Sequence, residues 1–62
     1  MTDVKSVDDS VKDLITQGRL KIQQRNYIEA IKLFTEVLET FNPNDQEAIF
    51  YRAISYLDQG NL

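Results

Sequence analysis

The chain has 62 residues with no cysteine and no histidine, and its ten acidic and seven basic side chains give a formal net charge of -3 at pH 7. A chain of this length forms at most one small domain, which buries only about 60% of the surface that the unfolded chain exposes. The composition excludes disulfides and the two commonest soft metal ligands as sources of stability, and the acidic balance argues against nucleic acid as a partner.

Residues 1–9 form an acidic lead-in to a helical domain, which we expect over residues 10–62. The lead-in has acids at Asp8 and Asp9 and lacks the basic start and apolar stretch of a signal peptide. No apolar run approaches the roughly 18 to 20 residues that cross a bilayer. We therefore expect a protein without membrane insertion that lies inside the cell, in the cytoplasm or the nucleus.

The first helix is expected over about residues 6–25. Two starts are open, because Ser6 with Asp9 and Ser10 with Asp13 both place an acid three residues after an N-cap residue. The apolar face is narrow, contains a glycine and recurs at helical spacing. Its members are Val11, Leu14, Ile15, Gly18 and Ile22.

The second helix is expected over about residues 27–41, with Asn26 as its cap, Glu29 in its first turn and Pro43 just beyond its end. Its apolar stripe is the clearest in the chain and consists of Tyr27, Ala30, Ile31, Phe34, Val37, Leu38 and Phe41. The short connection before it predicts an antiparallel hairpin with the first helix. A glycine inside a helix costs about 1 kcal/mol relative to alanine, so we expect Gly18 to face this stripe and admit it at close range.

The third helix is expected over about residues 45–58, with Asn44 or Asp45 as its cap and Gly60 at its end. Its apolar side chains spread around most of the circumference: Ala48, Ile49, Phe50, Tyr51, Ala53, Ile54, Tyr56 and Leu57. Such a helix requires neighbours on two sides. The hairpin can cover one side, and we expect the other to be covered by a segment supplied in trans or missing from this chain.

These residues resemble the tetratricopeptide repeat, a helical repeat of about 34 residues. The residues that match its motif are Leu14, Gly18, Ala30, Phe34 and Pro43, followed in the next unit by Ile49, Ala53, Tyr56 and Gly60. The chain departs from the motif at Gln17, Lys21 and Arg25, which replace the usual Leu, Tyr and Gly, and it has one extra residue before Pro43. Val37 lies where a small residue is usual. The resemblance covers about residues 11–62, which is one whole repeat and the first helix of a second.

The resemblance implies an all-α fold in which an antiparallel helical hairpin is followed by a capping third helix, as a fragment of an α-solenoid. The residues that it assigns to repeat packing are Leu14, Gly18, Tyr27, Ala30, Phe34, Ala53 and Tyr56. Residues 26–31 also resemble the three-helix microtubule-interacting-and-trafficking domain, which binds tail peptides in grooves. The tight turn at residues 42–44 and the turn at 58–61 favour the repeat.

We expect neither an enzyme nor a bound cofactor or metal. The only nucleophiles of the usual kinds are hydroxyls, and none has a base at a spacing that would place it alongside. The carboxylates of the second helix lie on its polar side, where solvated charge is expected. Neither glycine lies in a phosphate-binding loop, because Gly18 is inside a helix and Gly60 ends one.

Binding remains as the expected activity, and the resemblance implies a protein–protein interaction module of a scaffold or adaptor. In that family the first helix of each unit lines a concave face, which would bind a peptide or helix of a partner. The partner-binding residues carried over by position are Lys12, Ile15, Arg19, Ile22, Gln23, Phe50, Ile54 and Leu57. We expect Arg19 to pair with an acidic group and Phe50 to supply buried area. The alternative is that these side chains only cover the helix pair.

A partner would also meet the open apolar face of the third helix, and that partner can be a second copy of the chain. Ile49, Phe50, Ala53 and Leu57 form this face. Exposed contiguous apolar surface of this kind is typical of an interface. We therefore keep self-association as the alternative function and expect the isolated chain to associate.

Overall fold

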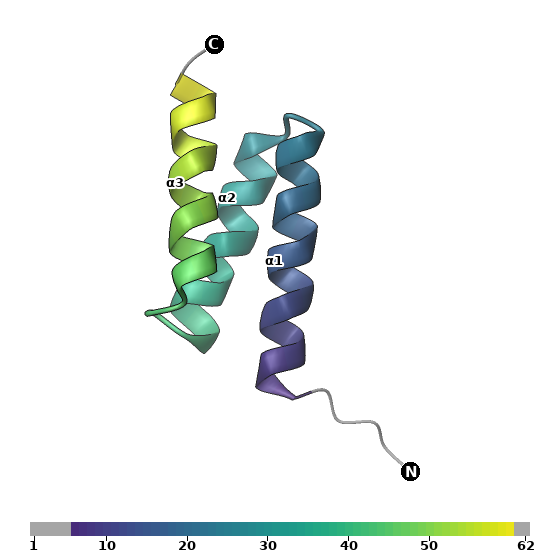
Figure 1. The fold of residues 1–62 in the computed structure, drawn as a ribbon, viewed down its shortest axis with the longest axis vertical. Helices are drawn as coiled ribbons and strands as arrows, with labels where there is room; N and C mark the ends of the chain where they lie inside the picture. Colours follow the sequence, from purple (N-terminus) through teal and green to yellow (C-terminus); the bar gives the residue numbers. More distant parts are fainter. Residues whose placement is uncertain (1–5, 61–62) are drawn as a thin grey trace.

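The computed structural model describes residues 6–60, which form three α-helices and one π-helical turn. α1 spans Val7–Gln23, α2 spans Tyr27–Glu36 and runs on into the π-turn η1 at Val37–Phe41, and α3 spans Gln46–Gly60. Figure 1 shows α1 and α3 on either side of α2, with α2 set behind them. The all-helical class and the three expected helices are confirmed.

The start of α1 is fixed by Ser6. Its Oγ accepts a hydrogen bond from the backbone N–H of Asp9 at 3.1 Å, so Ser6 and not Ser10 is the N-cap residue. Asp8 and Asp9 lie in the first turn, where the positive end of the helix dipole stabilises them. α1 therefore begins inside the expected lead-in of residues 1–9, of which the first five lie outside the described residues.

The turn from α1 to α2 is a Schellman motif with an arginine where glycine is usual. The N–H of Arg25 donates to the carbonyl of Ile22 at 2.9 Å, and the N–H of Asn26 donates to that of Lys21 at 2.8 Å. Arg25 takes up the left-handed conformation, with a φ of 62°. A side chain in this conformation costs roughly 1 to 2 kcal/mol, so the turn is formed at the expense of backbone strain at Arg25.

The expected cap of α2 is not formed as a side-chain bond. Asn26 precedes α2, but its side chain accepts no hydrogen bond from the first turn. Its φ of -96° and ψ of 73° differ from the extended conformation in which a cap side chain reaches the following N–H groups. The Schellman motif imposes this geometry, because it uses the N–H of Asn26 to close α1.

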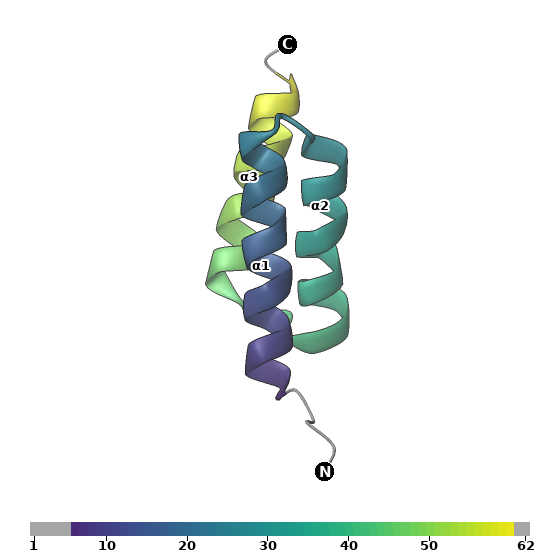
Figure 2. The ribbon, with the colours of Figure 1, turned by 90° about the vertical axis from the view of Figure 1, so that its right-hand side faces the viewer.

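The hairpin of α1 and α2 is packed around Gly18 and Phe34, and Figure 2 shows the two helices side by side. Gly18 is buried, and Phe34 is fully buried at 0% exposure. A Cβ placed on Gly18 would lie 2.5 Å from Cζ of Phe34 and 2.7 Å from its Cε1. No side chain fits there, so the expected close approach of the two helices is confirmed.

The π-turn η1 ends the second helical segment just before Pro43. The N–H of Asn42 donates to the carbonyl of Val37, five residues back, at 2.8 Å. A π-turn has a wider hydrogen-bonded ring than an α-helical turn. Val37 and Leu38 are buried, which keeps the wide turn packed in the core.

α3 begins at Asp45, whose Oδ1 accepts a hydrogen bond from the N–H of Ala48 at 2.9 Å. Asp45 is therefore the cap, and Asn44 lies in the turn before it, where its N–H donates to Oδ1 of Asn42 at 3.0 Å. The helix is described as far as Gly60, so the expected turn at residues 58–61 lies partly outside the described residues.

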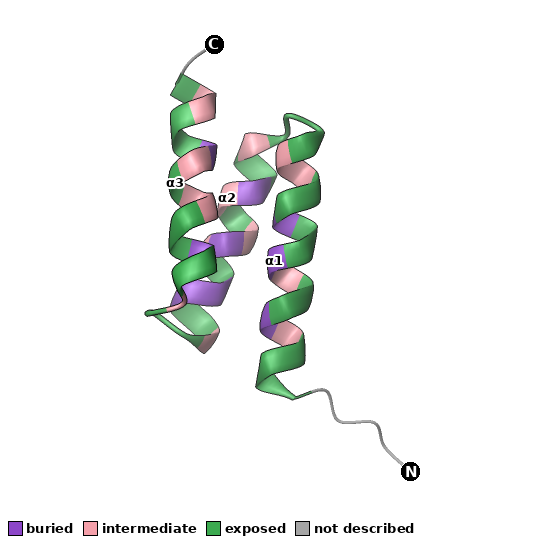
Figure 3. Cartoon of the chain, viewed as in Figure 1, coloured by how far each residue is buried: buried purple, intermediate pink, exposed green. Residues whose placement is uncertain are grey.

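The core lies between the three helices, and Figure 3 shows the buried positions along the sides on which the helices face one another. Its apolar members are Val11, Ile15, Ala30, Phe34, Val37, Leu38 and Ala48. α3 adds Ser55, which is fully buried and donates from Oγ to the carbonyl of Tyr51 at 2.8 Å. No helix within residues 6–60 is both long enough and apolar enough to cross a membrane.

Candidate partner-binding site

Three aromatic rings and one guanidinium form a continuous layer from the core to the surface between α1 and α3. The ring of Tyr51 stacks on that of Phe34 with centroids 5.9 Å apart and an interplanar angle of 21°. Phe50 meets Tyr51 edge-on with centroids 5.2 Å apart. Cζ of Arg19 lies 5.1 Å from the centroid of the Tyr51 ring, within the range of cation–π attraction. The guanidinium is thus held at a defined place on the surface.

Gly18 determines how closely this layer approaches the backbone of α1. Because Gly18 has no Cβ, the ring of Phe34 packs directly against the backbone of α1. Phe34 in turn supports Tyr51, and Tyr51 supports Arg19. A residue of the hairpin core therefore positions a cation that α1 presents to solvent.

α1 presents a polar stripe beside this layer. Lys12, Thr16, Arg19 and Gln23 follow one another at intervals of four, three and four residues, which places them on one side of the helix, and all four are exposed. Thr16, Arg19, Leu20 and Gln23 line a shallow hollow of about 230 Å³.

The stripe carries two cations, Lys12 and Arg19. The guanidinium of Arg19 packs over the ring of Tyr51. The chain as a whole carries a net charge of -3. Both cations lie on one face of α1 in a chain whose other charges are mostly acidic.

The structure leaves most of the predicted partner-binding residues accessible. Lys12, Arg19, Gln23, Phe50 and Leu57 are exposed, and Ile22 and Ile54 are half-buried. Ile15 is a correction: it is only 5% exposed and belongs to the core cluster, so a surface partner cannot reach it. The physical reason is that Ile15 lies on the core side of α1, with Val11 and Gly18.

The residues predicted for repeat packing divide between the hairpin and α3. In the hairpin, Gly18, Ala30 and Phe34 are buried, and Leu14 and Tyr27 are half-buried. In α3, Ala53 and Tyr56 are exposed. Both lie outside the core cluster of residues 6–60.

Sequence reasoning misses Tyr51 as a site residue, although it connects the core to Arg19. A signal for it is present in the spacing of Ala48, Tyr51 and Ser55, which are three and four residues apart. This spacing marks the inner side of α3. The signal is weak in the sequence because two of the three residues are small. The larger apolar side chains of α3 lie on its outer side and give the stronger pattern.

Among residues 6–60, no group of three or more acidic side chains lies close enough together to hold a metal ion. Compared with protein-family models, with curated proteins and with solved structures, the chain gave no match. The resemblances to the tetratricopeptide repeat and to the microtubule-interacting-and-trafficking domain therefore stay predictions.

Proposed function

We propose that this chain is a protein–protein interaction module that binds an acidic peptide segment of a partner on the face between α1 and α3. The proposal rests on one observation above all: the exposed guanidinium of Arg19 is held over the ring of Tyr51, beside the exposed ring of Phe50. The resemblance to the tetratricopeptide repeat, whose first helices line a binding face, supports the same interpretation.

The geometry favours a carboxylate as the recognised group. A guanidinium presents paired N–H donors that match the two oxygens of a carboxylate. Because Tyr51 already restricts the side chain of Arg19, less conformational entropy is lost when a ligand binds. Lys12 lies on the same stripe and adds a second positive charge.

An apolar side chain of the ligand would supply most of the buried area. Phe50 is 59% exposed and lies next to the ring that holds Arg19. An aromatic anchor next to an arginine is the combination that dominates binding energy at many interfaces. We therefore expect the ligand to combine a carboxylate with an adjacent apolar residue, and we expect weak binding that added salt weakens further.

The test is a selection of random peptides on the immobilised chain, followed by anisotropy titrations of the enriched peptides after fluorescent labelling. We expect enrichment of peptides in which Asp, Glu or the C-terminal carboxylate lies beside an apolar residue. Arg19→Gln should lower their affinity about tenfold, because it removes the charge-assisted hydrogen bonds.

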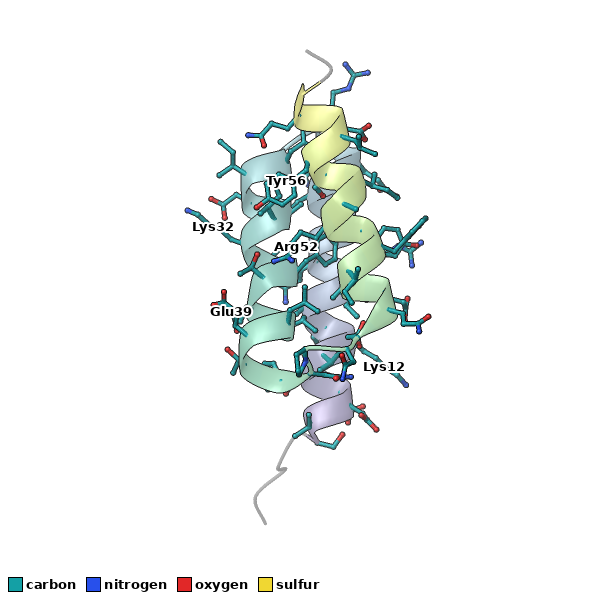
Figure 4. All side chains as sticks on the ribbon, turned by 90° about the vertical axis from the view of Figure 1, so that its left-hand side faces the viewer. Lys12, Lys32, Glu39, Arg52 and Tyr56 are labelled. Carbon is teal, nitrogen blue, oxygen red and sulfur yellow. The ribbon has the colours of Figure 1, made fainter. Side chains whose placement is uncertain are left out.

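Lys32→Gln is the matched control. It removes the same charge from an exposed residue of α2, and Figure 4 shows Lys32 pointing away from α3. This variant should bind the peptides as the wild type does. The proposal fails if the enriched peptides bind equally well to wild type and Arg19→Gln, or if both variants weaken binding to the same extent.

A further inference from the structure

The side of α3 that faces away from the hairpin carries a continuous stripe of apolar side chains, which we call the outer stripe. It consists of Ile49, Phe50, Ala53, Tyr56 and Leu57. The four large side chains are 46%, 59%, 55% and 66% exposed in the order Ile49, Phe50, Tyr56, Leu57. In Figure 4, where α3 lies in front, the side chain of Tyr56 extends from this helix toward α2, at the edge of the stripe.

The distribution of large apolar and small residues between the buried and exposed sides of α3 is the reverse of that in an ordinary amphipathic helix. The fully buried residues of α3 are the small Ala48 and Ser55, and four of its large apolar residues are exposed. An amphipathic helix that packs only on its own domain shows the opposite distribution. The inner side of α3 is therefore built for close packing on α2, and the outer stripe is built for contact with something outside residues 6–60.

The outer stripe is symmetric about Ala53. Ile49 and Leu57 lie four residues before and after it, and Phe50 and Tyr56 lie three residues before and after it. Isologous contact between two identical copies requires a self-complementary surface of this kind. A small residue at the centre lets two helix backbones approach each other.

We propose that the outer stripe binds the outer stripe of a second copy of this chain, with the two α3 helices antiparallel and the two-fold axis at Ala53. In this arrangement Ala53 faces Ala53 of the second copy. Leu57 lies at the height of the second copy's Phe50, and Ile49 lies at the height of its Tyr56. On each side of the two-fold axis, an aliphatic side chain of one copy then meets an aromatic side chain of the other. The dipoles of the two helices are antiparallel.

The area of the outer stripe fits a small dimer interface. Its large side chains together expose roughly 500 Å² of mostly apolar surface, at the upper end of what single patches on monomers show. Stable dimers commonly bury about 800 Å² on each partner. We therefore expect a concentration-dependent dimer rather than a permanent one.

This inference goes beyond the proposed peptide site and is separable from it. Phe50 lies at the border of both surfaces, but Ala53 is on the outer stripe only, and Arg19 is on α1. An Ala53 variant should therefore change association and leave the dependence of peptide affinity on Arg19 intact.

The first experiment uses the absence of cysteine from the natural chain. Ala53→Cys should form a disulfide-linked dimer under mild oxidation, because the two Cβ atoms face each other across the axis. Gln17→Cys is the control, since Gln17 is exposed on α1. We expect cross-linking at residue 53 to be at least about tenfold faster. Equal rates for the two variants would overturn the proposed axis.

The second experiment places charges at the axis without disturbing the fold, because Ala53 is exposed within the chain. In sedimentation equilibrium across a concentration series, the wild type should move from monomer toward dimer mass. Ala53→Glu and Ala53→Lys should each associate at least about tenfold more weakly, since like charges then face each other. An equimolar mixture of the two should regain the dimer, and Gln17→Glu should behave as the wild type.

Two results would overturn the proposal. One is a wild-type chain that stays monomeric at every concentration, which would assign the outer stripe to a different partner. The other is a mixture of Ala53→Glu and Ala53→Lys that stays monomeric although the wild type dimerises, which would exclude an axis at Ala53.

Discussion

Gly18 in α1 and Ala53 in α3 are both small residues among larger apolar ones, yet only Gly18 is covered. The ring of Phe34 lies against Gly18 so closely that no Cβ would fit. Ala53 is exposed, and the apolar side chains around it are exposed as well. A small residue among large apolar ones predicts the close approach of another helix in both places. The approach occurs within the chain at Gly18, and at Ala53 we propose that a second copy supplies it.

The same contrast separates the two phenylalanines that touch Tyr51. Phe34 is fully buried, and Phe50 is 59% exposed. Both rings contact the ring of Tyr51, one by stacking and one edge-on. The hairpin thus uses its aromatic residue for stability, whereas α3 presents its aromatic residue to solvent. The loss of stability caused by substitutions at matched positions tests this difference.

The largest effect is expected from truncation of the two phenylalanines. Phe34→Ala removes a fully buried ring and should lower the free energy of unfolding by about 3 to 5 kcal/mol, which is enough to unfold much of so small a domain. Phe50→Ala at low protein concentration should cost less than about 1 kcal/mol, since the lost ring is largely exposed. Urea unfolding followed by far-UV circular dichroism measures both values. Equal losses would contradict the contrast.

The second largest change in the free energy of unfolding is expected at the glycines. Helix propensity and steric overlap act there in opposite directions. Alanine in a helix interior is favoured over glycine by about 1 kcal/mol. At Gly18, however, the new Cβ would lie 2.5 Å from the ring of Phe34, and overpacking of this kind costs about 1 to 3 kcal/mol, so we expect net destabilisation.

Gly60→Ala is the control for this prediction, because a Cβ on Gly60 has no atom within 4 Å. It should leave the stability unchanged or raise it by a few tenths of a kcal/mol. The same urea unfolding experiment compares the two variants. A gain in stability for Gly18→Ala would show that the hairpin tolerates a wider separation of α1 and α2.

The sequence predicted the fold well where one side chain decided the local structure. The close contact of Gly18 with the second helix and the break near Pro43 were predicted from single residues and their spacing, and Ser6 was one of the two helix starts left open. These features depend on short-range geometry, for which the sequence holds enough information.

The site was predicted less well, because it depends on contacts between separate helices. The resemblance assigned the polar residues Lys12, Arg19 and Gln23 to a partner-binding face, and the structure shows that they are exposed on α1. Ile15 was assigned to the same face, although its spacing with Val11 and Gly18 also places it on the apolar side of the first helix, and it is buried there. Tyr51 was missed because its contacts come from α1 and α2, which only the packing of the helices brings to it.

The last prediction concerns the turn after α1, where the main substitution is expected to stabilise the chain. Arg25 has a φ of 62°, a conformation that glycine adopts without strain. Arg25→Gly should relieve the strain, although the added freedom of the unfolded chain offsets part of the gain. We expect a net increase of about 0.5 to 1 kcal/mol in the free energy of unfolding.

Arg25→Ala separates the backbone from the side chain in this experiment. Alanine removes the guanidinium but keeps the strained conformation, so the stability should remain close to that of the wild type. If Arg25→Ala stabilised the chain as much as Arg25→Gly, the benefit would come from loss of the arginine side chain. A gain for glycine alone would instead show that the hairpin imposes the left-handed conformation on residue 25, because the two hydrogen bonds of the Schellman motif hold the turn in place whichever residue occupies it.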